Sequence, residues 1–356
     1  MQLVVQFVKS TVEKLKLSIE KKLKNPDPLW IFFSFPFQFV FRIAIYLKKL
    51  KRKKISQTNT TICVGNITIG GNGKTPFLIF LADQLKKYHP MILSKGYGRS
   101  STGDLCVELS SDFKEVGDEP LLIKSTLPEF LVYVTDSRKG FLDKIHNRFC
   151  ILDDGLQDSK MKFDFNLCLF DKNVLSKKQY LIPTGILREP FDSLKNIDLI
   201  AIKGSVEQKE FESLQKMFKK PLLTFDMKVK EFVGFNHQKF ILTDPTAFFC
   251  AIGNPESFKE TLIKQNVNIK DQLIFIDHAK LDCDKLEVWI NKCLSSGVKQ
   301  IVCTKKDAIK LRSVKNYKLP IFFLETEIQI ENGKEQFDLF VDQVGTFLET
   351  KSIIKR

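Results

Sequence analysis

Several features that would assign a protein class at once are missing from this chain of 356 residues. It has no heptad array and no collagen period, and no segment repeats every ~20–50 residues, which excludes coiled coils, collagens and solenoids. Its eight cysteines include no C-x-x-C pair, so neither a zinc ribbon nor a thioredoxin-type site is indicated. Some of them lie within apolar, strand-like runs such as residues 62–64 and 301–303. We therefore expect buried free thiols in a reducing compartment.

Most of the chain's net positive charge lies in its N-terminal segment, and the rest of the chain carries little. Lys and Arg number 56 against 42 Asp and Glu, a balance of +14, and residues 1–54 hold 13 basic but only 3 acidic residues. Residues 55–356 are therefore nearly balanced, at +4, and we expect no nucleic-acid partner. With 43% hydrophobic and 28% charged residues the chain is expected to fold, and its length predicts two or three domains.

The N-terminal arm, residues 1–54, combines an amphipathic helix over residues 3–23 with an aromatic apolar segment over residues 29–47. A basic cluster follows at residues 48–54. The apolar segment has the ~20 residues that a transmembrane helix needs. Three residues interrupt it: Pro36, Gln38 and Arg42. We favour a helix that lies in the membrane interface, with the basic cluster on anionic headgroups, over a spanning helix or an ordinary core helix.

A strand, a glycine-rich turn and a helix follow in the order that a P-loop requires. Residues 61–65 predict a short buried strand, and the apolar positions of residues 77–85 predict a helix. The turn between them is our candidate ATP site: Thr68, Ile69, Gly70, Gly71, Asn72, Gly73, Lys74 and Thr75. Backbone N–H groups of such a turn converge on phosphate oxygens, Lys74 would reach the β- and γ-phosphates, and the Thr75 hydroxyl would bind Mg²⁺. The first glycine of the strict motif is replaced by Thr68.

A pair of carboxylates supplies the acidic partner of this turn. The apolar run at residues 149–152 ends in Asp153 and Asp154. Carboxylates at the C-terminal end of a parallel strand lie in the ligand crevice of the sheet, so we expect one of them to hold Mg²⁺ directly or through water. Gln157 would position Mg²⁺, water or a phosphate oxygen.

Residues 153–157, Asp-Asp-Gly-Leu-Gln, and residues 64–76 together resemble the tetraacyldisaccharide 4'-kinase family, the lipid A 4'-kinases. Further blocks match in the family's order: residues 94–99, 116–120, 135–138, 181–190, 251–255, 275–278 and 304–308. The resemblance implies ATP-dependent phosphorylation of the 4'-hydroxyl of a tetraacylated disaccharide 1-phosphate, with ATP and Mg²⁺ as cofactors. It also implies action at the cytoplasmic face of the bacterial inner membrane. No protein partner is evident.

The resemblance also implies two α/β domains joined by a two-stranded β linker. We therefore predict an α/β fold: a P-loop parallel sheet flanked by helices, a second smaller α/β domain and the N-terminal membrane-associated arm. The expected boundaries are 1–54 for the arm, 55–222 for the P-loop kinase domain, 223–244 for the linker and 245–356 for the smaller domain, which would close over the nucleotide site. Strand-like runs across the body agree with this class: residues 91–93, 131–135, 150–153, 167–170, 199–202, 248–252 and 300–303.

The resemblance makes Asp118 the general base toward the 4'-hydroxyl, because kinases commonly use a carboxylate to accept that proton. Without the resemblance, Asp118 ahead of an apolar helix would be taken as a helix cap. His278 would orient and tune Asp118 from the second domain.

Arg138 and Arg188 are candidate anion clamps, because planar guanidinium groups suit the phosphates of donor and acceptor. An ordinary surface salt bridge is the alternative for each. Weaker candidates for substrate contact are Glu119, Arg99 and Tyr97.

The chain departs from the family pattern at a few positions. Leu156 and Asp158 stand where the family has Phe and His, Ala279 replaces a second His, and Lys305 replaces a Glu. Asp158 adds a negative charge close to the expected Mg²⁺. The runner-up function is a membrane-associated P-loop switch or chaperone NTPase, which would hydrolyse nucleotide without lipid.

Overall fold

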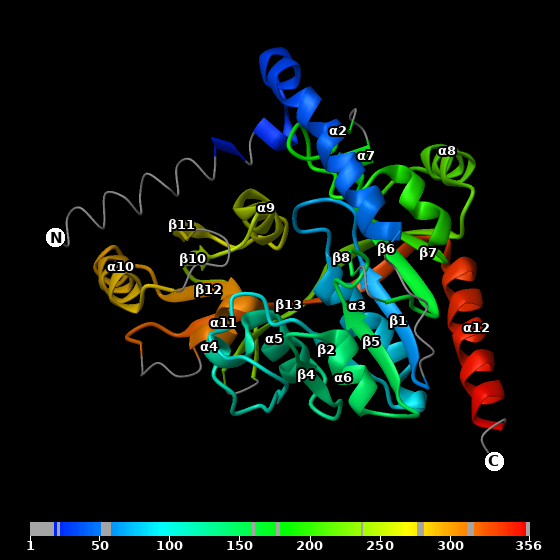
Figure 1. The fold of residues 1–356 in the computed structure, drawn as a ribbon. Coiled ribbons are helices and arrows are strands. Elements are labelled where there is room, and N and C mark those ends of the chain that lie inside the picture. Colours follow the sequence, from blue (N-terminus) through cyan, green and yellow to red (C-terminus); the bar gives the residue numbers. More distant parts are fainter. Residues whose placement is uncertain are drawn as a thin grey trace. The chain divides into compact units, whose positions relative to one another are not determined.

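The computed structural model describes residues 18–19, 22–50, 58–158, 161–175, 179–235, 238–275, 281–311 and 317–353. Helices and strands alternate along most of this range (Figure 1). Most of the strand pairs are parallel, among them β1–β6, β6–β7, β2–β4, β10–β11, β10–β12 and β12–β13. The predicted α/β class is therefore confirmed.

The structure contains the α-helices α2 (Pro28–Leu50), α3 (Lys74–Gln84), α4 (Phe113–Val116), α5 (Asp118–Thr126), α6 (Arg138–Lys144), α7 (Lys172–Leu175), α8 (Gln208–Phe218), α9 (Pro255–Lys264), α10 (Cys283–Ser295), α11 (Lys305–Leu311) and α12 (Lys334–Ile353), and two short 3-10 helices at Lys86–Tyr88 and Phe191–Asn196. The strands are β1 (Thr60–Gly65), β2 (Met91–Ser94), β3 (Leu105–Cys106), β4 (Val132–Val134), β5 (Phe149–Asp153), β6 (Phe165–Asp171), β7 (Leu199–Lys203), β8 (Leu222–Gly234), β9 (Lys239–Phe240), β10 (Thr246–Cys250), β11 (Ile269–Ile274), β12 (Gln300–Thr304) and β13 (Ile321–Asn332).

The chain divides into two compact units, and neither is continuous in sequence. Unit 1 consists of Met1–Lys74, Leu152–Thr224 and Glu331–Arg356, and unit 2 of Thr75–Ile151 and Phe225–Ile330. The domain boundaries expected from the sequence stay a prediction. Within the range expected for the linker, β8 pairs antiparallel with β9.

In unit 1, β6 lies between β1 and β7, and all three strands are parallel. Every residue of β1 is buried. Strands of a parallel sheet are covered on both faces, which explains why residues 61–65 form a continuous run without alternating polar positions. Asp164 holds the start of β1 in place, because its carboxylate accepts hydrogen bonds from the backbone N–H and the hydroxyl of Thr61, at 2.8 and 3.0 Å.

Helix α2, also in unit 1, presents one stripe of side chains to residues 181–192. Trp30 donates its indole N–H to the Thr184 carbonyl at 3.2 Å, and the Ser34 hydroxyl bonds that of Thr184 at 2.9 Å. The Gln38 side-chain oxygen accepts from the Leu181 N–H at 3.1 Å. Phe41 and Ile45 continue the stripe at helical spacing and pack against the apolar core of unit 1. The side of α2 that carries Ser34 and Gln38, together with Phe41 and Ile45, therefore faces residues of unit 1.

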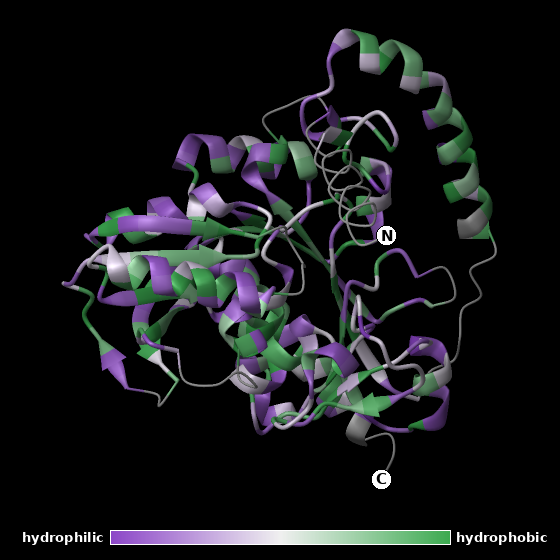
Figure 2. Ribbon diagram, turned by 90° about the vertical axis from the view of Figure 1, so that its left-hand side faces the viewer, coloured by the Kyte–Doolittle hydropathy of each residue, from purple (hydrophilic) through white to green (hydrophobic). Residues whose placement is uncertain are grey.

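The remaining sides of α2 are apolar and exposed. Figure 2 shows this helix mostly in the colours of hydrophobic residues. Its exposed large apolar side chains are Leu29, Phe32, Phe33, Phe35, Phe37, Phe39, Val40, Ile43, Tyr46, Leu47 and Leu50. By length and composition alone, Pro28–Leu47 could cross a membrane. Exposed apolar faces of this kind are typical of interaction surfaces.

In unit 2, the strands follow the order β5-β2-β4-β3 in one group and β11-β10-β12-β13-β8 in the other. Side chains of β10 alternate between two apolar clusters: Ala247 and Phe249 belong to one, and Phe248 and Cys250 to the other. This alternation places apolar cover on both faces of β10 and fixes the strand ends that lead into the site.

Candidate active site

The glycine-rich turn lies between β1 and the first residue of α3, Lys74. Gly70 and Gly73 have φ values of +117° and +75°, which favour glycine. A Cβ placed on Gly70 or Gly71 would meet no atom within 4 Å, so open space lies beside this backbone. A turn with open space before a helix N-terminus is suited to bind phosphate oxygens through its N–H groups.

Thr68, which replaces the first glycine of the strict motif, braces the turn. Its hydroxyl accepts a hydrogen bond from the Asn72 side-chain amide at 2.6 Å, and both residues are buried. The next residue, Ile69, donates its N–H to the Ile186 carbonyl at 2.8 Å. The departure at Thr68 therefore supplies a cross-link within the turn.

Asp154 lies between two cations. Its backbone has φ +53°, a conformation that Asp tolerates better than most residues, and its N–H bonds the Val64 carbonyl at 2.8 Å. The Arg188 guanidinium donates to both carboxylate oxygens, at 3.1 and 3.2 Å, and the Lys74 ammonium is 3.7 Å from Oδ1. Asp154 therefore fixes Arg188 and draws Lys74 toward the end of the turn. The Arg188–Asp154 ion pair is partly buried, with side-chain exposures of 26% and 34%.

Asn66, to which the sequence motifs assign no role, bonds both Arg188 and Gln157. It is fully buried, and Arg188 donates to its side-chain oxygen as well as to its carbonyl, the latter at 3.3 Å. The same carbonyl accepts from the Gln157 side chain at 2.7 Å. Gln157 thus holds the backbone just before the turn. The available signal was position, because Asn66 directly follows the strand in the matching block at residues 64–76.

The oxygen donors near the turn fit Mg²⁺. Asp153 is buried at the C-terminal end of β5, Asp154 is next to it, and the Thr75 hydroxyl follows Lys74 in the chain. Mg²⁺ prefers oxygen ligands and keeps several waters, so one or two carboxylates suffice. Among the described residues, no three His, Cys, Asp or Glu gather as a metal cluster, which is compatible with such a sparse site.

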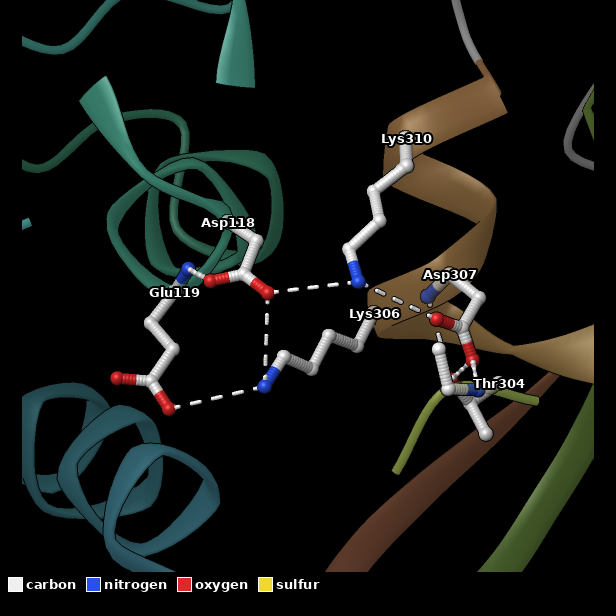
Figure 3. A network of polar contacts seen from close by, with 7 residues as sticks. Asp118, Glu119, Thr304, Lys306, Asp307 and Lys310 are labelled. Carbon is white, nitrogen blue, oxygen red and sulfur yellow. Dashed lines mark hydrogen bonds and ion pairs between the residues drawn. The ribbon is translucent and has the colours of Figure 1, made fainter. Parts of the chain in front are cut away.

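Asp118 begins α5 in unit 2, after Gly117 with φ +92°. Its Oδ1 accepts the Glu119 N–H at 3.0 Å, so the carboxylate does bond the start of the helix. Its Oδ2 lies 3.5 Å from the ammonium of Lys306 and 3.5 Å from that of Lys310, both on α11 (Figure 3). Asp118 is therefore a buried carboxylate flanked by two lysines as well as a residue of the first helical turn.

A second carboxylate, Asp307, anchors the far side of this network. It is fully buried, and its Oδ2 accepts from the Ala251 N–H at 3.0 Å and from the Thr304 hydroxyl at 2.7 Å. Its Oδ1 is 3.5 Å from the Lys310 ammonium. We did not assign Lys306, Asp307 or Lys310 a role from the sequence. Two of them lie in the matching block at residues 304–308, which was the available signal.

Arg99 is paired within its own loop region. It forms an ion pair with Asp136, and its guanidinium donates to the Gly103 carbonyl at 2.8 Å. The Gly103 N–H and the Arg99 guanidinium together hold the pKa of Asp136 below its usual range. This arrangement joins two of the family-matching blocks, residues 94–99 and 135–138.

The other expected substrate residues differ in exposure. Arg138 is buried at the start of α6, so it is no surface salt bridge. Tyr97 is 80% exposed, and a Glu119 oxygen lies 3.9 Å from the Lys306 ammonium. His278 lies outside the described residues, and its pairing with Asp118 stays a prediction.

Comparison with known proteins identifies the family. The family model described as tetraacyldisaccharide-1-P 4'-kinase matches residues 28–345. The tetraacyldisaccharide 4'-kinase of Aquifex aeolicus is 32% identical over 313 residues, covering 83% of this chain and 91% of that protein. The enzyme of the same name from Shewanella denitrificans is 34% identical over 285 residues, covering 75% and 81%.

A solved structure agrees with the sequence matches. A crystal structure of LpxK from Aquifex aeolicus, described as its "apo" form in complex with ATP, superposes with a TM-score of 0.69 at 27% identity, covering 87% of this chain and 98% of that one. The resemblance inferred from the motifs is thereby confirmed. Since the family match runs from the start of α2 into α12, this chain belongs to the tetraacyldisaccharide-1-P 4'-kinase family.

Proposed function

We propose that this protein transfers the γ-phosphate of ATP to the 4'-hydroxyl of a tetraacylated disaccharide 1-phosphate, a step of lipid A biosynthesis. The observation that carries this proposal is the braced glycine turn with open space beside Gly70 and Gly71, directly ahead of Lys74. The family supplies the identity of the acceptor, and the ATP complex of the related Aquifex aeolicus LpxK agrees with the donor.

The donor side uses the glycine-rich turn and the residues that bond to it. Lys74 is 3.7 Å from Asp154, longer than a hydrogen bond, so its ammonium can turn its donors to the β- and γ-phosphates of ATP. Asp153 and the Thr75 hydroxyl would hold Mg²⁺, which neutralises phosphate charge when bound. Arg188, fixed by Asp154 and Asn66, supplies a further positive charge near the transferred group.

The acceptor side uses Asp118. Its carboxylate would take the proton of the 4'-hydroxyl as the O–H bond breaks and the new O–P bond forms, while ADP leaves with the electron pair of the broken P–O bond. His278 would orient Asp118, and Arg138 would stabilise phosphate charge. Further contacts to the acceptor would come from Glu119, Arg99 and Tyr97.

The acceptor is a lipid, so we propose that the enzyme works on the cytoplasmic face of the bacterial inner membrane. The contacts of α2 favour a position in the membrane interface over one that spans the bilayer. Its polar stripe bonds Thr184 and Leu181, while its exposed aromatic side remains available to acyl chains.

Label transfer from γ-labelled ATP to a tetraacyldisaccharide 1-phosphate in detergent, with Mg²⁺, tests this function. We expect Asp118→Asn to lower the rate by a factor of about 10²–10⁴, the usual contribution of a general base. Asp112→Asn is the matched control, because Asp112 caps α4 through the Lys114 N–H and asparagine caps a helix equally well. ATP hydrolysis without labelled lipid would instead support a P-loop switch or chaperone NTPase.

A further inference from the structure

Two lysines of α11 meet the carboxylate that we assign as the general base (Figure 3). We infer that Lys306 and Lys310 are positioning residues that hold Asp118 ionised and fixed in direction, with Asp307 as the anchor of Lys310. This inference rests on the proposed function, because it concerns how the proposed base is prepared.

The contacts converge on a single atom. Both ammonium groups lie 3.5 Å from Oδ2 of Asp118, while Oδ1 is bonded to the Glu119 N–H at 3.0 Å. Each carboxylate oxygen is thus held from a different element, Oδ1 by α5 and Oδ2 by α11.

Lys310 is suited to position Asp118 and unsuited to bind a substrate itself. Its side chain is only 2% exposed, and its ammonium lies 3.5 Å from Asp118 and 3.5 Å from Asp307. Asp307 cannot follow a movement of Lys310 easily, because the Ala251 N–H and the Thr304 hydroxyl hold its other oxygen. Residues at the ends of β10 and β12 therefore hold Asp307, Asp307 holds Lys310, and Lys310 holds Asp118.

The charges of the network favour an ionised Asp118. Glu119 and Asp307 bring two further carboxylates close to it, and Lys306 and Lys310 offset two of the three negative charges. The neighbouring helix α4 adds Lys114 and Glu115, and the Lys114 ammonium lies over the Phe113 ring. A base that must work beside polyanionic ATP and a sugar phosphate gains from such neutralisation, since it keeps its charge without repelling its substrates.

The alternative is that the lysines only join α5 to α11. A buried ion pair can serve structure alone, and its removal is costly in either case. The two explanations differ in pH dependence. Loss of a nearby positive charge favours the protonated carboxylic acid, so a positioning lysine alters the acid limb of the rate profile, whereas a purely structural one lowers the rate equally at every pH.

The test is the pH profile of kcat/KM for lipid phosphorylation in Lys310→Met and Lys306→Met. We expect both acid limbs to move to higher pH by about one unit. Lys305→Met is the matched control, because Lys305 lies on the same helix but pairs with Glu325 at 2.8 Å. Its profile should overlay the wild type. Unchanged acid limbs in both test variants would overturn the inference; if Lys310→Met does not fold, Lys306→Met decides alone.

A double-mutant cycle separates this inference from the proposed function. Urea unfolding of Lys310→Met, Asp118→Asn and the double variant needs no kinase activity. We expect the two single variants together to lower the urea midpoint by more than the double variant does, because each breaks the same contact. Additive midpoints would contradict the contact. A wild-type rate in Asp118→Asn would instead reject the proposed base, whatever the cycle shows.

Discussion

At the scale of single residues, Lys74 can be removed with little effect on the fold. Its pairing with Asp154 is long, and Asp154 keeps both contacts with Arg188 when Lys74 is lost. We expect Lys74→Met to lower kcat/KM for ATP by a factor of about 10²–10³, because a positive charge aimed at the transferred phosphoryl group is lost. Its free energy of unfolding should fall by less than about 1 kcal/mol.

Steady-state kinetics and urea unfolding check this prediction. Lys86→Met is the matched control, since Lys86 is an exposed lysine paired with Asp83 at 3.3 Å. Its kinetics should equal those of the wild type. Phosphorylation at the wild-type rate by Lys74→Met would show that the turn does not bind the donor phosphates through this lysine.

Sequence motifs identify residues such as Lys74 but do not identify the residues that hold the site's side chains in place. Lys74 and Asp154 could be predicted because their chemistry requires them at a fixed place in a strand-turn-helix pattern. Asn66 and Lys310 could not, because their roles depend on contacts with residues more than a hundred positions away, Arg188 and Asp118. Only the folded chain brings such pairs together.

At the scale of elements, two glycine loops pack together just before Asp118. A Cβ on Gly96 would lie 2.6 Å from the Val116 carbonyl, and one on Gly117 would lie 3.1 Å from the Gly96 Cα. Gly117 also has φ +92° and ψ 153°, a region that is nearly restricted to glycine. We expect Gly117→Ala to lower the free energy of unfolding by about 1–3 kcal/mol and to reduce kcat by displacing Asp118.

Gly98→Ala is the control for this substitution. Gly98 also has a positive φ, of +78°, but open space surrounds the position of its Cβ. Gly98→Ala should lower the free energy of unfolding through backbone strain alone and keep the wild-type kcat. Urea unfolding and steady-state kinetics of both variants test this prediction. A kcat in Gly117→Ala equal to that of the wild type would show that the Gly117 backbone does not position Asp118.

Helix α2 gives a second prediction for an element. Phe32 and Phe39 are exposed on its apolar side, and serine has a similar helix propensity to phenylalanine. We expect the Phe32→Ser/Phe39→Ser variant to bind anionic lipid vesicles at least about tenfold more weakly, because burial of each ring contributes about 1.5–3 kcal/mol when complete. Its melting temperature should stay unchanged.

Vesicle co-sedimentation and thermal melting measure both properties. Ile241→Ser is the control, since Ile241 is an exposed apolar residue outside this helix. Retention of wild-type vesicle binding by the double variant would argue against α2 as the membrane contact. The apolar stretch was predictable from composition. The role of Ser34 and Gln38 was not, because it depends on hydrogen bonds with Thr184 and Leu181, which are distant in sequence.

At the scale of the whole molecule, both units assemble from segments that are distant in sequence. Local patterns predicted the seven strand-like runs, since buried parallel strands are short and continuously apolar. They could not predict which segments share a unit. That choice depends on long-range pairings such as β1 with β6 and β10 with β12, each set by packing across the whole fold.

The reactivity of the thiols measures how well the interior of each unit is shielded from solvent. Burial raises the pKa of Cys150 and Cys250 to about 12 and that of Cys293 to about 11, and it raises the pKa values of Cys168 and Cys303 as well. The thiolate is the form that reacts, so at pH 8 almost none of these groups is in the reactive state. Only Cys106 and Cys283 are partly exposed among the eight cysteines.

We therefore expect Ellman's reagent at pH 8 to label at most these two thiols quickly in the native protein and all eight in urea. In Cys106→Ser/Cys283→Ser the fast phase should vanish, and the six remaining thiols should react only at the rate of unfolding. Because the pKa values are raised, a higher pH increases the thiolate fraction, but burial still blocks the reagent until the units open. Fast labelling of more than two thiols in the native protein would show that a unit opens locally under native conditions, with mass spectrometry identifying which one.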